Sequence, residues 1–73
     1  MKKVQLEIIK NNEFIIVRDQ QDPEDLYYRT RVINYEYNGV QWEGVDLSFI
    51  NFLDRVQREP SLSINLNIKE GEF

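Results

Sequence analysis

Four acidic residues fall within one short polar segment and are the first candidates for chemistry: Asp19, Asp22, Glu24 and Asp25. Their carboxylate oxygens could hold a hard cation or meet a basic partner surface. A calcium loop of the EF-hand type needs alternating oxygen ligands and a central glycine, whereas Pro23 stands inside this segment. We therefore expect no metal here. Two interpretations of this segment remain: a loop exposed to solvent, and a contact patch for a basic partner.

A second group alternates tyrosine and arginine at odd-numbered positions of one expected strand. It comprises Tyr27, Arg29, Arg31, Tyr35 and Tyr37. An unbroken strand would place these side chains on one face, where rings could stack on bases and guanidinium groups could meet phosphates. The structural alternative is cross-strand aromatic pairing, with arginine stems lying over the rings. The third reading is a protein-contact surface.

The only tryptophan, Trp42, is expected beside these tyrosines. Tryptophan, tyrosine and arginine are enriched at interface hot spots, because they bury a large area while keeping a polar tip. In a small chain a single tryptophan also serves as core. The sequence leaves open whether this aromatic group faces inward or outward.

The chain has no histidine and no cysteine. It therefore lacks an imidazole base, a thiolate nucleophile and the usual zinc ligands. Its three glycines fit neither a phosphate loop nor a dinucleotide fingerprint. We expect no enzymatic activity and no cofactor.

The length and net charge of the chain limit its domain organisation and the kinds of partner it can bind. We expect a single compact domain over residues 1–73, since a chain of this size forms one small core. The net charge of −4 argues against nucleic-acid binding, which needs a positive surface. No segment approaches the roughly 20 apolar residues of a membrane span, so no membrane contact and a cytoplasmic location are expected.

Alternating apolar residues predict the first strands. Residues 4–9 read as a half-buried strand and residues 14–17 as one covered on both faces. A two-residue turn at Asn11-Asn12 would place Ile8 opposite Ile15, and Leu6 opposite Val17.

A long strand, bent or bulged, is expected over residues 26–37. It is followed by the Asn38-Gly39 turn, which favours a type I′ hairpin. That turn pairs Tyr37 with Val40, and Tyr35 with Trp42.

The second half predicts a helix and a last strand. Asp46 is a good N-cap, and the helical stripe that follows comprises Phe49, Ile50, Phe52, Leu53 and Val56. Pro60 ends the helix. Residues 62–68 alternate as a final strand, with Lys69 onward as a frayed tail. The predicted fold is α+β, a small antiparallel sheet of about five strands in the order β-β-β-β-α-β with one amphipathic helix packed on one face.

In size, acidity, composition and its strand-helix-strand ending, the chain resembles small acidic inhibitors of phages and other mobile elements, such as anti-CRISPR proteins and phage inhibitors of uracil-DNA glycosylase. The resemblance implies a non-enzymatic protein-binding module that occludes a basic surface of a host enzyme or defence complex. The expected contact residues are Asp19, Asp22, Glu24, Asp25, Tyr35, Tyr37 and Trp42. The alternatives are a self-associating structural protein that pairs through residues 62–68, and a single-stranded nucleic-acid-binding sheet.

Overall fold

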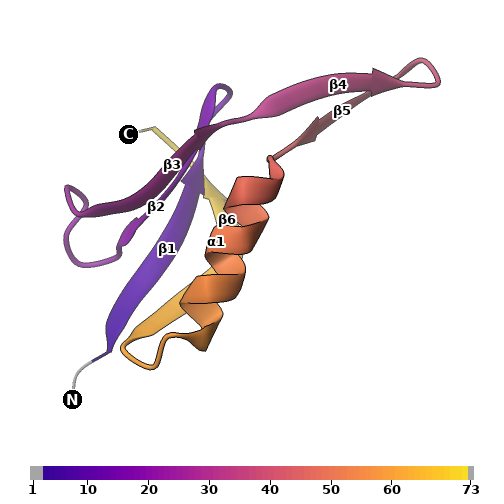
Figure 1. The fold of residues 1–73 in the computed structure, drawn as a ribbon. Coiled ribbons are helices and arrows are strands. Elements are labelled where there is room, and N and C mark those ends of the chain that lie inside the picture. Colours follow the sequence, from indigo (N-terminus) through magenta and orange to yellow (C-terminus); the bar gives the residue numbers. More distant parts are fainter. Residues whose placement is uncertain (1–2, 73) are drawn as a thin grey trace.

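The alternating residues near the N-terminus form the centre of a four-stranded sheet (Figure 1). The computed structural model describes residues 3–72, apart from the side chains of Tyr35 and Trp42. The strands of this sheet are β1 (Val4–Lys10), β2 (Phe14–Asp19), β3 (Leu26–Arg31) and β6 (Leu62–Glu70), in the order β3-β2-β1-β6. Helix α1 (Leu47–Arg58) covers one face of it, while strands β4 (Ile33–Tyr37) and β5 (Val40–Gly44) form a separate hairpin.

The predicted α+β class is confirmed, with two differences in the strands. The sheet is mixed rather than antiparallel, because β6 runs parallel to β1. A helix of 12 residues carries the chain back over the sheet, about 18 Å at 1.5 Å per residue, so that β6 starts where β1 starts. There the Val4 amide donates to the Ser61 carbonyl at 3.0 Å.

The expected long strand over residues 26–37 is divided into β3 and β4, which gives six strands in the described chain. The division falls at Val32, whose amide donates to the Glu13 carbonyl at 2.9 Å. Strand β2 begins at Phe14, so the chain beyond Val32 has no further partner in the large sheet. It pairs with β5 instead.

The predicted pairing of β1 with β2 is wrong by two residues. Ile8 lies opposite Val17, and Lys10 lies opposite Ile15. The Asn11 side chain accepts from the amides of Glu13 and Phe14, each at 2.8 Å, and so moves the turn one residue along the chain. A shift of two residues keeps every side chain on its face, so the predicted core residues still point the same way.

The main core lies between the sheet and α1, and Ile9 and Ile16 are also buried, on the opposite face of the sheet. The main core contains Leu6, Ile8, Ile15, Val17, Phe49 and Val56. As predicted, Asp46 caps the helix, accepting from the Phe49 amide at 3.0 Å. This bond, followed by the bond from the Ser48 hydroxyl, lowers the pKa of the Asp46 carboxyl. Ile50, expected in the buried stripe, is half exposed instead.

Strand β6 departs from its predicted alternation. Leu62 and Ile64 pack against the core, but Leu66 and Ile68 are half exposed. The register with β1 shifts between Ile64 and Ile68, where the Asn67 amide donates to the Asn65 side chain at 3.0 Å. Beyond this bulge the strand continues through Lys69 to Glu70, residues that were expected to fray.

Candidate functional site

The acidic segment forms the loop between β2 and β3, and two of its carboxylates stabilise the loop itself. Asp19 accepts from the Gln21 amide at 2.9 Å, and Asp22 accepts from the Glu24 amide at 3.2 Å. Glu24 and Asp25 are exposed. Within residues 3–72 no three acidic side chains are grouped in a way that could hold a metal ion.

Tyr27 does not share a face with Arg29 and Arg31. The pairing of β2 with β3 shifts between Val17 and Arg18, so Tyr27 is the extra residue of a bulge and packs against the core. Burial raises the pKa of the Tyr27 hydroxyl, and the charges of Asp25 and Asp19 raise it further. The predicted alternating platform is therefore broken at two places, by this bulge at Tyr27 and by the division at Val32.

The hairpin has the predicted pairing. Tyr37 lies opposite Val40, and position 35 lies opposite position 42. Asn38 and Gly39 have φ values of 52° and 76°, as a type I′ turn requires. The side chains of Tyr35 and Trp42, both expected contact residues, lie outside the described part of the structure.

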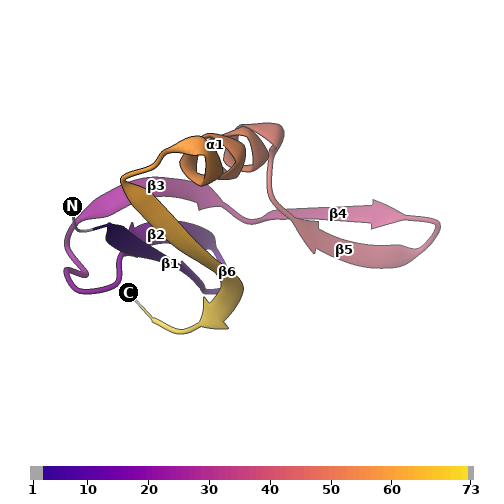
Figure 2. The same cartoon turned by 90° about the horizontal axis from the view of Figure 1, so that it is seen from below.

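Strands β4 and β5 project beyond the main sheet (Figures 1 and 2). The molecule measures 50 × 25 × 16 Å, and its radius of gyration is 13.4 Å. A compact chain of this length would have a radius of about 11 Å. Apart from their pairing with each other, the two strands do not pack against any other strand or helix of the described chain. A side-chain ion pair between Lys10 and Glu43 links the hairpin's base to β1.

One face of the hairpin is apolar and uncovered. Ile33, Tyr37 and Val40 are exposed by 43%, 66% and 52%. The alternate positions carry polar residues, which are Asn34, Glu36, Gln41 and Glu43. No lysine or arginine occurs from residue 32 to residue 54, so the hairpin is also an acidic element.

The hairpin turn yields a first prediction. Alanine at Gly39 would meet no atom within 4 Å, but its φ of +76° is strained for any residue with a side chain, by about 1 kcal/mol. We expect Gly39→Ala to open the hairpin while leaving the main sheet intact. Amide hydrogen exchange should then quicken over residues 33–44 and stay unchanged in β1 and β2.

The matched control for this turn is Gly71→Ala. A side chain at Gly71 would make only an ordinary contact, 3.8 Å from Ile9, and no positive φ is involved. If amide exchange also became faster throughout β1 and β2 in Gly39→Ala, the hairpin would not open independently of the main sheet.

The two groups of predicted contact residues do not form one patch. The acidic loop precedes β3 and the hairpin follows it, so they lie at opposite ends of that strand (Figure 1). A strand of six residues spans about 20 Å. A partner that touched both would have to reach along the whole strand.

The sequence reasoning missed a cluster on the sheet face opposite the helix. Arg29 and Arg31 do lie over a ring, as the structural alternative expected, but the ring belongs to Phe14. Arg31 lies opposite Phe14 in the β2–β3 register. The alternation of the arginines was visible in sequence, but their partner ring is in another strand.

The same face contains an ion-pair network around the buried carboxylate of Glu7. Glu7 accepts from Arg18 at 2.9 Å and from Lys69 at 3.2 Å. The hydrogen bond from Arg18 is the main reason that the pKa of Glu7 is lowered, and burial opposes it. These three residues join β2, β1 and β6.

Comparison with protein-family models, curated proteins and solved structures gave no match. Within residues 3–72 no helix has the length and apolar character needed to cross a membrane.

Proposed function

We propose that this chain is a non-enzymatic protein-binding module whose hairpin, β4–β5, docks onto a protein partner. The observation that carries the proposal is the uncovered apolar face of the hairpin, represented by Ile33, Tyr37 and Val40. An isolated two-stranded hairpin is at best marginally stable in water. In β4–β5, apolar and polar residues alternate strictly, which is typical of a strand pair with one buried face. No other element of the described chain covers that face.

The charge of the hairpin defines the partner's surface. Glu36 lies on its polar face and forms no ion pair within residues 3–72, whereas Glu43 on the same face is paired with Lys10. A complementary partner offers an apolar groove bordered by lysine or arginine. The acidic loop at the far end of β3 adds long-range attraction, and its exposed Glu24 and Asp25 are the carboxylates not used to hold the loop.

We favour an inhibitory role, in which the module covers a functional surface of its partner. A small acidic protein that covers a basic surface of a host enzyme or defence complex, in the cytoplasm, needs no catalytic group. The net charge of −4 and the projecting acidic hairpin support this form.

The test compares capture of partners from host lysate by the wild type and by a Tyr37→Ser/Val40→Ser variant. We expect the wild type to retain one dominant stoichiometric protein and the variant to lose it. The control is Leu47→Ser, which removes an apolar side chain exposed by 72% on α1 and leaves the hairpin intact. Equal capture by the hairpin variant would overturn the proposal, as would binding that does not weaken with salt.

Self-association through β6 is a second candidate. Strand β6 lies at an edge of the main sheet, and Leu66 and Ile68 are half exposed. The bulge opposite Glu7 interrupts this edge, which opposes regular pairing with another copy. Sedimentation equilibrium decides between the candidates, since a monomer mass that does not change with concentration removes self-association.

A further inference from the structure

The sheet face opposite α1 carries a second candidate site. On β2 the residues that point to this face are Phe14, Ile16 and Arg18, because their neighbours Ile15 and Val17 belong to the core. On β3, Arg31 lies opposite Phe14 and Arg29 lies opposite Ile16. The face therefore combines apolar and cationic side chains in adjacent strands.

Two guanidinium groups are held against one ring. The Cζ atoms of Arg29 and Arg31 lie 4.2 and 5.2 Å from the centroid of the Phe14 ring. Neither arginine forms an ion pair with a carboxylate of residues 3–72, whereas Arg18, Arg58, Lys10 and Lys69 each do. Two exposed positive charges thus stand together with no ionic partner among residues 3–72, in a chain that has more acids than bases.

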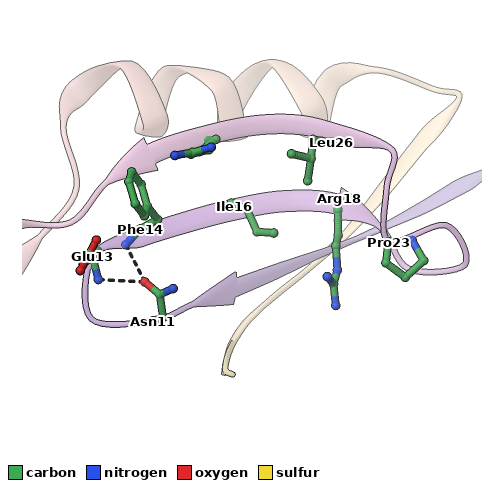
Figure 3. A pocket seen from close by; sticks show the side chains of 8 residues that line it. Asn11, Glu13, Phe14, Ile16, Arg18, Pro23 and Leu26 are labelled. Atoms are coloured by element: carbon green, nitrogen blue, oxygen red, sulfur yellow. Dashed lines mark hydrogen bonds between the residues drawn. The ribbon is translucent and has the colours of Figure 1, made fainter. Parts of the chain in front are cut away.

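A depression of about 530 Å³ adjoins this pair (Figure 3). Phe14, Ile16, Pro23 and Leu26 give it an apolar lining, and Arg29 also lines it. The remaining lining residues are Asn11, Glu13 and Arg18. Arg18 is engaged by Glu7 and Asn11 by the turn amides, so Arg29 is the lining cation with no ionic partner in the described chain.

We propose that this face binds an acidic protein segment in which a carboxylate side chain stands next to an apolar one. The carboxylate binds Arg29 and Arg31, and the apolar side chain lies in the adjoining depression on Pro23 and Leu26, which are both exposed. Arginine is the residue best suited to bidentate recognition of a carboxylate. The site is independent of the hairpin, which lies in a different sheet.

A nucleic-acid strand fits this face less well. Base stacking needs an open ring face, and the guanidinium groups of Arg29 and Arg31 already lie over the Phe14 ring. The neighbouring loop carries exposed carboxylates on Glu24 and Asp25, which repel a phosphate backbone. A single carboxylate needs only the two arginines and avoids that repulsion.

The experiment is an NMR titration of the labelled protein with the peptide acetyl-Leu-Glu-Leu-amide, which carries one carboxylate. We expect it to shift the side-chain Nε–H signals of Arg29 and Arg31 and the amide signal of Phe14. Arg29→Gln/Arg31→Gln should weaken binding about tenfold. The control Arg55→Gln/Arg58→Gln removes two arginines of α1 and should bind as the wild type does. The hairpin variant Tyr37→Ser/Val40→Ser should also bind the peptide normally, which separates this site from the proposed function.

Four results would overturn the proposal. The first is no shift at these signals when the peptide is added to the wild type. The second is equal binding of the matched peptide in which glutamine replaces glutamate. The third is tighter binding of an oligothymidine strand, which would identify a nucleic-acid surface. The fourth is the same set of shifts on simply concentrating the protein, which would identify a second copy as the occupant.

Discussion

Phe49→Ala is expected to remove about 3–5 kcal/mol of stability, the usual cost of deleting a buried aromatic side chain. Phe49 is 2% exposed and is the largest fully buried side chain among those that the structure describes. It joins α1 to the sheet, with its ring 5.7 Å from that of Tyr28 on β3. A chain of this size is stable by roughly 4–11 kcal/mol in total, so the loss amounts to a large part of the whole.

Urea unfolding followed by circular dichroism measures this loss. The matched control is Ile50→Ala in the next position of the same helix, where the side chain is 50% exposed and we expect a change within about 0.5 kcal/mol. Because Phe49→Ala could leave too little folded protein to measure, Phe49→Leu provides a milder step of about 1 kcal/mol. Equal effects at positions 49 and 50 would contradict the packing of α1 described above.

Local signals in the sequence predicted local structure well. The Asn38-Gly39 turn determines the register of β4 with β5, because only one pairing fits a two-residue type I′ loop. The N-cap at Asp46 and the end of α1 before Pro60 are equally local. The turn after β1 was missed because the Asn11 side chain closes it through two hydrogen bonds, which moves its centre by one residue.

Long-range features could not be predicted in the same way. Residues 26–37 contain no glycine or proline, so nothing in that segment marks the division at Val32. The division depends on where β2 begins. The parallel pairing of β6 with β1 likewise depends on the path of α1 over the sheet. The same holds for the candidate sites. The hairpin was visible in the sequence, whereas the Phe14 ring beneath the Arg29 and Arg31 guanidinium groups belongs to a different strand.

Glu7→Gln is expected to destabilise the protein by about 2 kcal/mol at neutral pH, because it leaves a largely buried arginine without its ionic partner. Glu7 is 7% exposed. It lies directly opposite Arg18 in the β1–β2 register and also binds Lys69 on β6. The substitution keeps the size of the side chain, so the loss reports charge rather than packing. Chemical unfolding at neutral pH measures it.

The control variant is Lys69→Gln. Lys69 is half exposed, so its bond to Glu7 is screened by solvent, and its removal should cost well under 1 kcal/mol. If Lys69→Gln lost as much stability as Glu7→Gln, the bond between Glu7 and Arg18 would not be the main contribution of Glu7 to stability.

Acid should reproduce the effect of Glu7→Gln in the wild type. The pKa of Glu7 is lowered from its ordinary value of 4.5, chiefly by the hydrogen bond from Arg18. A carboxyl whose pKa is lower in the folded state stabilises the fold fully above the unfolded pKa, and that contribution is lost as pH falls through the folded value. The wild type should therefore lose stability below about pH 4.5 more steeply than Glu7→Gln. A smaller slope will remain in the variant, because the pKa of Asp46 is lowered as well, from 3.8. Parallel pH profiles for the two proteins would show that Glu7 is not ionically bound in the folded chain, and the joining of β2, β1 and β6 through this residue would then rest on packing alone.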